Sequence, residues 1–431
     1  MQTSREGSSA AFRVADAPGA ARTESAAAPS VLPAVRSLEG RMLRALLDAF
    51  GNPPVQFALW NGDRVMTAAA DPVATLHIPD RRTLMRLCAD PDVQFGELYS
   101  IGKIQVEGDL GRLIEVLYQG AARPGRNSVS LARRLGNWLH RRPANTLDGS
   151  RENIHHHYDI GNEFYSLWLG ATMAYTCAYF PAPDDVLDRA QLAKMEHVCR
   201  KLQLRAGEHV VEAGCGWGSL ALYMARHYDV KVTAFNISRE QIAYARHQAE
   251  AEGLSHNVEF VEDDYRNISG SFDAFVSVGM LEHVGVENYP ALGELIRRCL
   301  KPDGRGLIHT IGRNRRKPMH RWIDRRIFPG ANPPSLKQMM DIFEDAGFSV
   351  LDVENLRLHY ARTLECWHQL YEQSSERVAQ MFDEDFVRMW RLYLLGSRAA
   401  FTTGEMQLFQ VVFAPARSNS IPWTRSHVYR S

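Results

Sequence analysis

Residues 209–218 constrain the fold more than any other stretch of the chain. They read His-Val-Val-Glu-Ala-Gly-Cys-Gly-Trp-Gly, an apolar strand that ends in a glycine-rich turn. Glycine lets the backbone pass close to a ligand, and a helix after such a turn presents free N–H groups at its N-terminus. The glycines do not have the G-x-G-x-x-G spacing of a dinucleotide fold, and Trp217 would leave little room for a pyrophosphate. The pattern therefore predicts a pocket for S-adenosylmethionine.

Three further strands are predicted at 230–235, 258–261 and 272–278, and helical patterns separate the first three strands of the series. This alternation predicts an α/β fold with a doubly wound, mostly parallel sheet, in which ligands bind outside the carboxyl ends of the strands. Polar residues follow each strand as expected: Asn236, Ser238 and Gln241; Asp263, Asp264, Tyr265 and Arg266; Glu282 and His283. Helix capping explains Ser238 and Asp264 at least as well as ligand contact does.

Several motifs occur in a fixed order along the chain. They are 157–165 (His-Tyr-Asp-Ile-Gly-Asn-Glu-Phe-Tyr), 175–180 (Tyr-Thr-Cys-Ala-Tyr-Phe), the turn at Gly214, 280–285 (Met-Leu-Glu-His-Val-Gly), 309–312 (His-Thr-Ile-Gly), Trp322-Ile323 with 327–330 (Ile-Phe-Pro-Gly), and 359–364 (His-Tyr-Ala-Arg-Thr-Leu). With these motifs the chain resembles the cyclopropane-fatty-acyl-phospholipid synthase family over roughly residues 85–415. That family includes mycolic acid cyclopropane synthases and enzymes that add a methyl branch. The resemblance implies a methyltransferase fold with a smaller N-terminal α+β domain.

The resemblance also implies a reaction. A methylene passes from S-adenosylmethionine to a cis double bond of a phospholipid acyl chain, and a bound bicarbonate ion deprotonates the intermediate carbocation. The matching bicarbonate pocket is Cys177, Glu282, His309, Ile311 and Tyr360. Taken singly, Cys177, His309 and Tyr360 are also explained as core residues, and Glu282 as a carboxylate at a helix start. One alternative is a methyl-branched unsaturated acyl chain made in the same pocket. The intact pocket argues against a lipid-binding protein without catalysis.

By the same resemblance, a set of residues surrounds the cofactor. The set is Tyr175, Thr176, Val210, Glu212, Gly214, Cys215, Gly216, Trp217, Gly218, Asn236, Ser238, Gln241, Asp264, Tyr265 and Arg266. Many methyltransferases place an acidic residue at the end of the second strand, where this chain has Asn236 and Gln241. Near the C-terminus, Ser397 stands where relatives often have cysteine, which excludes a thiolate at that position.

The chain divides by composition into five parts. We expect a disordered leader at 1–35, a small domain at 36–125, a basic linker at 126–150, a catalytic domain at 151–418 and a flexible tail at 419–431. Alternating apolar residues near Phe57 and Leu76 predict short strands in the small domain. Two roles for this domain stay open: engaging lipid, and packing or dimerisation. A homodimer is expected by resemblance.

Charge is balanced overall, with 50 basic and 50 acidic residues, so no global field favours nucleic acid or an anionic membrane. No stretch resembles a membrane span or a secretory signal, and a cytoplasmic protein is expected. Six scattered cysteines lack metal-ligand spacing, and the adjacent side chains of His155, His156 and His157 cannot all face one ion, so no metal is expected.

Local charge is concentrated between Arg313 and Arg326. Seven basic residues stand there against Asp324 alone, with Met319 and Trp322 among them. This mixture favours reversible, peripheral association with the inner face of the membrane, where basic side chains meet phosphate and apolar ones meet acyl chain. The alternative is an ordinary solvated loop.

Overall fold

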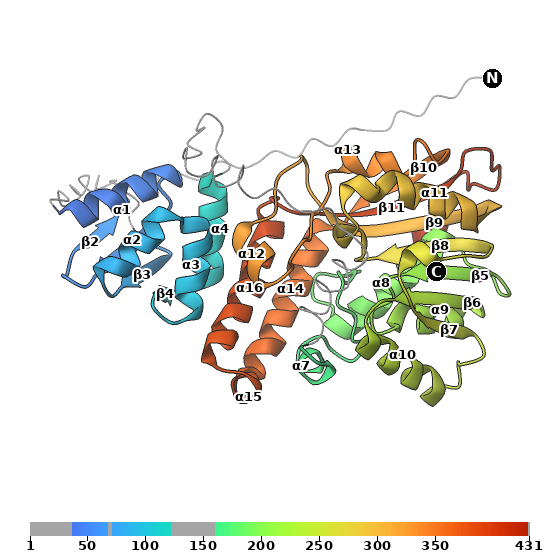
Figure 1. Cartoon of the computed structure of the whole chain (residues 1–431), viewed down its shortest axis with the longest axis horizontal. Helices are drawn as coiled ribbons and strands as arrows, with labels where there is room; N and C mark the ends of the chain where they lie inside the picture. Colours follow the sequence, from blue (N-terminus) through green and yellow to red (C-terminus); the bar gives the residue numbers. More distant parts are fainter. Residues whose placement is uncertain (1–36, 68–70, 122–159, 430–431) are drawn as a thin grey trace, which may run out of the picture. The chain divides into compact units, whose positions relative to one another are not determined.

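The computed structural model describes residues 37–67, 71–121 and 160–429 (Figure 1). The predicted leader, the whole of the predicted linker and the three adjacent histidines lie outside the described residues. Within the described residues, the strands form a four-stranded sheet and a seven-stranded sheet.

Residues 38–121, here called the small domain, form a mixed sheet in the order β2-β1-β3-β4 with four helices. Strand β1 pairs in parallel with β3 and antiparallel with β2, and β4 pairs antiparallel with β3. Alternate residues of β1 and β3 are buried, which gives the sheet one apolar face and confirms the expected α+β domain. Its elements are α1 Leu38–Ala49, β1 Val55–Leu59, β2 Arg64–Met66, β3 Ala74–Ile78, α2 Arg81–Ala89, α3 Pro91–Ser100, β4 Gln105–Gly108 and α4 Leu110–Ala121.

The larger sheet has the strand order β10-β11-β9-β8-β5-β6-β7. Strands β5 to β9 pair in parallel, whereas β11 runs antiparallel to both β9 and β10, so the predicted mostly parallel sheet is confirmed. The four strands predicted from sequence match β5 to β8 within one residue at each end. The strands are β5 His209–Ala213, β6 Lys231–Asn236, β7 Val258–Glu262, β8 Phe272–Val278, β9 Leu300–Gly312, β10 Phe348–Asn355 and β11 Gln407–Pro415.

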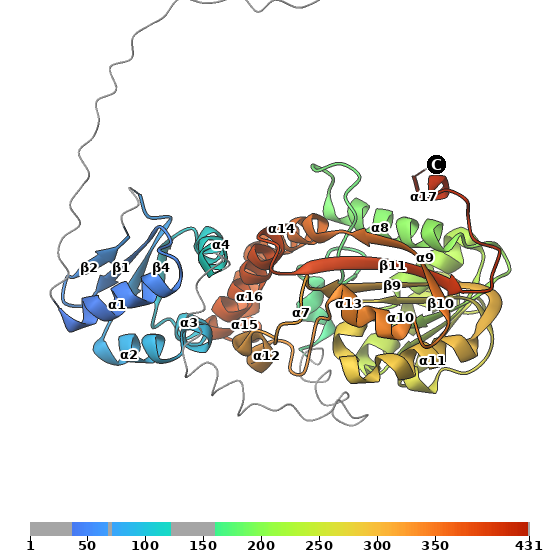
Figure 2. The ribbon, with the colours of Figure 1, turned by 90° about the horizontal axis from the view of Figure 1, so that it is seen from above.

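Helices cover both faces of this sheet, as the doubly wound fold predicts. One buried cluster joins the sheet to α8, α9 and α10, and a second joins it to α11, α13 and η4. Figure 2 shows α8 and α9 on one side of the strands and α11 and α13 on the other. The helices and 3-10 turns as far as η4 are α7 Asn162–Ser166, α8 Leu187–Leu202, α9 Ser219–Tyr228, α10 Arg239–Ala251, η1 Tyr265–Asn267, η2 Leu281–His283, η3 Val286–Asn288, α11 Tyr289–Cys299, α12 Arg321–Arg326, α13 Leu336–Met339 and η4 Met340–Ile342.

Helices α14 (Arg357–Gln373), α15 (Ser375–Met381) and α16 (Glu384–Thr402) follow near the C-terminus. Helix α16 packs against α14 and also against α3 and α4 of the small domain, and all share one hydrophobic core. The predicted flexible tail contains a last short helix, α17 (Ser426–Tyr429), which packs on α8.

Much of the basic segment 313–326 contacts other parts of the chain. Arg321 forms an ion pair with Asp90 at 2.7 Å, and Arg326 pairs with Glu97, so both connect α12 to the small domain. Trp322, which is buried between them, packs against Gly96 of α3. Arg315, Arg316 and Arg325 are exposed and form no ion pair with the described residues. The segment is therefore partly a connection within the protein.

None of the helices in the described ranges combines the length and the apolar character needed to cross a membrane.

Candidate active site

The polar residues predicted at the strand ends meet at one edge of the larger sheet. Strands β5, β6, β7 and β8 are parallel neighbours, so the turn at Gly214, Asn236, Asp263 and the segment 279–282 all follow carboxyl ends at that edge. The strand–turn–helix pattern therefore places the glycine turn beside the other predicted cofactor residues.

Backbone hydrogen bonds attach the glycine turn to the end of β6, and one of its glycines has open space beside it. The N–H groups of Gly214 and Cys215 donate to the carbonyl of Phe235 at 2.9 and 3.0 Å. A Cβ at Gly218 would overlap Phe260 and Ala245, but at Gly216, with φ 54°, a Cβ would meet nothing within 4 Å. Among the described residues, the backbone at Gly216 thus borders open space.

Several members of the predicted cofactor set have side chains in the core, among them Val210, Cys215 and Trp217. The Val210 side chain is fully buried in the cluster beneath α8 and α9. The Trp217 indole packs against Tyr165, with ring centroids 5.0 Å apart, and its N–H donates to Asn162 Oδ1 at 2.7 Å. Any contact of Val210 with a cofactor would therefore come from its backbone.

After β6, the side-chain amides of Asn236 and Gln241 form hydrogen bonds in the loop that leads to α10. Asn236 Nδ2 donates to Gln241 Oε1 at 2.7 Å and to the Gly216 carbonyl at 3.3 Å, which ties this loop to the glycine turn. Ser238 caps α10 by accepting the N–H of Gln241. These uncharged groups occupy the place where many methyltransferases have a carboxylate.

After β7, Asp264 caps η1 and forms an ion pair with Arg266. Asp264 accepts the backbone N–H of Arg266 at 2.9 Å and also pairs with its guanidinium. That guanidinium lies 5.5 Å from the centre of the Tyr265 ring, and burial raises the pKa of Tyr265 to about 12. The phenol therefore stays protonated near neutral pH and keeps its O–H as a hydrogen-bond donor.

A buried lysine supports the cofactor set and was not predicted from sequence. Lys194 of α8 is only 2% exposed, and its ammonium donates to Thr176 Oγ1 at 3.1 Å. Burial lowers the pKa of Lys194 to about 8 and raises that of Glu212, at the end of β5, to about 7. One turn earlier, Gln191 donates to the Thr176 carbonyl at 2.9 Å. The only sequence signal was a lysine three residues after a glutamine on the buried stripe of a helix.

The five residues predicted for the bicarbonate pocket lie around one cavity. Glu282, in η2, accepts the backbone N–H of Ile311 at Oε1. Its Oε2 atom is buried and has no hydrogen-bond partner among the described residues. Burial raises the pKa of Glu282 to about 7, so the carboxyl group is poised between its two protonation states near neutral pH.

His309 lies on β9 next to β11 and is neutral. Burial lowers the pKa of its imidazole to about 3. The Gln410 amide nitrogen lies 3.0 Å from Nδ1 of His309. Because the amide nitrogen is the donor, Nδ1 is the acceptor and the ring carries its hydrogen on Nε2. Nε2 is buried and has no partner in the described part of the chain. Its N–H is therefore available to an anion.

Cys177 and Tyr360 complete the set. Cys177 is fully buried, its Sγ lies 3.1 Å from the Ala178 carbonyl, and burial raises its pKa, so it is a thiol and not a thiolate. The Tyr360 ring lies 4.6 Å from the ring of Phe401 on α16. Both residues face a site whose walls are mainly apolar.

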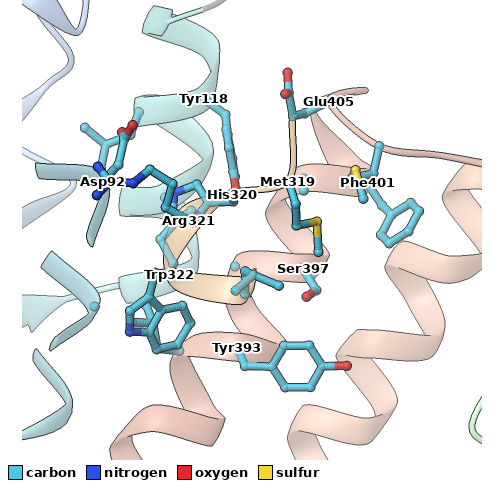
Figure 3. Close-up of a pocket in the computed structure, with 18 of the residues that line it drawn as sticks. Asp92, Tyr118, Met319, His320, Arg321, Trp322, Tyr393, Ser397, Phe401 and Glu405 are labelled. Carbon is cyan, nitrogen blue, oxygen red and sulfur yellow. The ribbon is translucent and has the colours of Figure 1, made fainter. Parts of the chain in front are cut away.

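The cavity has a volume of about 380 Å³ and reaches from this pocket into the small domain. Tyr175 and Thr176 of the cofactor set line it, and so do core residues of the small domain, among them Leu47, Phe57 and Leu76. Figure 3 shows Tyr393 and Ser397 of α16, Tyr118 of α4 and the segment 319–322 around this cavity. The cavity lining therefore combines mainly apolar residues with Glu282 and His309, each of which has a buried polar atom without a partner among the described residues.

No group of three His, Cys, Asp or Glu side chains that could hold a metal occurs among the described residues.

Comparison with known proteins identifies the family. The signature of the mycolic acid cyclopropane synthetase family matches residues 146–411. This chain belongs to that family. It is therefore an enzyme that transfers carbon from S-adenosylmethionine, as the sequence predicted. A separate match covers residues 42–128 and is to a domain of unknown function, DUF7884.

The known relatives match different shares of this chain. A probable fatty acid methyltransferase of Pseudomonas putida is 36% identical over 88% of this chain and 96% of its own length. The cyclopropane-fatty-acyl-phospholipid synthase of Escherichia coli K12 is 40% identical over 62% of this chain and 68% of its own. The structure of the mycolic acid cyclopropane synthase CmaA1, complexed with SAH and CTAB, aligns with a TM-score of 0.58 and 29% identity over 61% of this chain and 97% of that one.

Proposed function

We propose that this enzyme is a cyclopropane-fatty-acyl-phospholipid synthase, which transfers a methylene from S-adenosylmethionine to a cis double bond of a phospholipid acyl chain. The observation that carries the proposal is a pair of buried polar atoms, Glu282 Oε2 and His309 Nε2, which have no partner among the described residues and belong to residues that line a mainly apolar cavity. An apolar cavity suits an acyl chain, and a neutral N–H beside a carboxyl group suits a small anion with its own hydroxyl.

The proposed roles follow from the chemistry of each group. When bound, S-adenosylmethionine supplies an electrophilic methyl group, and the residues named above at the glycine turn and strand ends would hold it. An alkene that gains this methyl group carries positive charge, which the aromatic faces of Tyr175 and Tyr360 stabilise. The apolar walls exclude water, which would otherwise convert the cation into an alcohol.

Bicarbonate is the base that we propose for ring closure. His309 Nε2–H would donate to it, and Glu282, when ionised, would accept its O–H. The Ile311 N–H donates to Glu282 and so orients that carboxylate. The buried thiol of Cys177 and the ring of Tyr360 would enclose the ion. A proton from the transferred methyl group would pass to this base as the ring closes.

The part of the cavity lining that comes from the small domain is an argument for a phospholipid substrate. Its core residues Leu47, Phe57 and Leu76 continue the wall of the cavity that starts at Glu282. The E. coli relative is named for an acyl phospholipid, and the CmaA1 structure contains CTAB. We therefore favour lipid engagement over packing alone as the role of this domain.

Mass spectrometry of the acyl products tests this function. We expect that purified protein, S-adenosylmethionine and vesicles of cis-monounsaturated phospholipid give a gain of one CH2 with loss of the double bond. Derivatisation that distinguishes a ring from an alkene decides between the products. The same gain with an alkene retained would establish the methyl-branching alternative, which the name of the P. putida relative favours. No gain with any unsaturated phospholipid would refute both.

The same assay tests the base. In buffer stripped of carbon dioxide, turnover is expected to fall by about tenfold or more and to recover when bicarbonate is added, as for the loss of a general base. Sodium chloride at the same ionic strength is the control. Equal turnover in both buffers would remove bicarbonate from the mechanism.

We also propose that the enzyme is cytoplasmic and associates reversibly with the inner face of the membrane, because its proposed substrate is a phospholipid of that membrane. Arg315, Arg316 and Arg325 are the exposed cations of segment 313–326 that form no ion pair with the described residues. A cation near an anionic leaflet contributes about 1 kcal/mol. A homodimer stays a prediction, which the native mass would test.

Replacing Arg315, Arg316 and Arg325 with alanine is expected to weaken co-sedimentation with anionic vesicles at low salt by about tenfold or more. The control variant replaces Arg205, Arg239 and Arg298, which are also exposed, and so removes the same charge elsewhere. If both variants bind equally well, segment 313–326 is an ordinary surface.

A further inference from the structure

Gly396 differs from other helical glycines in what surrounds it. A Cβ built at Gly96, Gly120 or Gly293 would lie 2.4, 1.9 or 2.1 Å from the nearest atom, so close packing explains each of them. At Gly396, in the interior of α16, a Cβ would meet no atom of the described residues within 4 Å. Glycine destabilises a helix interior relative to alanine. The packing of the described residues gives no reason for a glycine here.

The free space at Gly396 belongs to the cavity. Gly396 lines the cavity as part of one face of α16, with Leu392, Tyr393, Ser397, Ala400 and Phe401. Residues three or four apart share a helix face, so these side chains form one continuous wall. Figure 3 shows Tyr393, Ser397 and Phe401 from this wall.

The position of Gly396 along the helix places it close to the proposed reaction centre. About one turn before it, the Tyr393 hydroxyl lies 2.7 Å from the hydroxyl of Tyr175. Little more than one turn after it, the Phe401 ring contacts Tyr360. Since one helical turn spans about 5.4 Å, Gly396 lies between two residues that touch the predicted site.

We propose that Gly396 is a specificity-determining residue, and that the acyl chain beside the reacting double bond occupies the space left by its missing side chain. A cis double bond bends the chain, so the cavity must be widest at that point. This inference rests on the proposed function. It adds that α16 selects the position of the double bond along the chain.

The test uses the full-length enzyme with Gly396→Ala and Gly396→Leu. The substrates are vesicles of two phospholipids whose acyl chains have equal length but carry the cis double bond at different positions. For Gly396→Leu we expect kcat/KM for the preferred lipid to fall by about tenfold or more, and the ratio between the two lipids to change, because added methylenes in an apolar pocket discriminate on this scale. Affinity for S-adenosylhomocysteine should not change. Thr402→Leu, at the exposed end of the same helix, is the control.

The outcomes separate this inference from the proposed function. If the parent modifies neither lipid, the proposed function fails and the inference fails with it. If the parent is active and Gly396→Leu keeps the parent ratio and rate, only the inference is overturned. Gly396→Ala should raise the melting temperature, because alanine favours the helix. If the leucine variant does not fold, a changed ratio in the alanine variant supports the inference and an unchanged ratio overturns it.

Discussion

Glu282→Gln is expected to retain cofactor binding and to lose most turnover, with kcat lower by roughly 10²-fold or more. Glutamine keeps the shape of the side chain and can still accept the Ile311 N–H, but it has no negative charge. Its amide nitrogen is also a donor, whereas the ionised carboxylate could accept the O–H of bicarbonate. Single-turnover rates on unsaturated phospholipid, together with calorimetric binding of S-adenosylhomocysteine, separate chemistry from cofactor affinity.

Glu287→Gln is the control for this substitution, since it makes the same change five residues further on at an exposed position. It should leave turnover at the parent level. Equal activity in Glu282→Gln and the parent would remove Glu282 from the site.

The same substitution has a consequence for stability at different pH values. Burial raises the pKa of Glu282 from 4.5 to about 7, so the folded protein holds a proton that the unfolded chain releases. The contribution of Glu282 to the free energy of unfolding should therefore be largest below about pH 4.5 and should be lost as pH rises to about 7, a change of about 3 kcal/mol for this group alone. Glu282→Gln should flatten the slope in this window. Part of the slope should remain in this variant, because burial also raises the pKa of Glu212 to about 7.

The central sheet could be predicted because its signals are local. Each of β5 to β8 is a short apolar run followed by glycine or polar residues. The apolar run and the turn residues after it identify each strand. The candidate site could be predicted only through motif order, because nothing local in His309 or Tyr360 distinguishes an anion ligand from a core residue. Ser238 and Asp264 illustrate the limit, since the structure shows both of them as caps and their contact with a cofactor stays a prediction.

The contacts that could not be predicted join residues far apart in sequence. Arg321 meets Asp90 across 231 residues, and Gln410 reaches His309 across 101. Such pairs leave no periodic pattern, because each partner is a polar residue that also fits a surface or a core position. For this reason the sequence predicts for segment 313–326 a membrane-contacting surface or a solvated loop, and not a connection to the small domain. Only the fold shows that Arg321 and Arg326 are engaged by the small domain while three other arginines remain exposed.

His309→Leu is expected to lower kcat by about 10²-fold, because leucine fills the space but removes the Nε2–H that we propose as the anion's donor. His309→Gln retains an amide N–H and should recover part of the lost rate. Gln410→Leu should raise the bicarbonate concentration needed for half-maximal turnover without changing affinity for S-adenosylhomocysteine, because Gln410 donates to Nδ1 and so keeps the hydrogen on Nε2.

Gln407→Leu is the control for Gln410→Leu. Gln407 is also buried on β11, but it bonds to Asn355 and to the Gly404 carbonyl. If Gln410→Leu and Gln407→Leu raise the bicarbonate requirement equally, the effect comes from disturbing β11 and not from the imidazole. If only Gln410→Leu raises it, a neutral histidine held in one tautomer is the donor, and the hydrogen bond from β11 is the reason that β9 can present it.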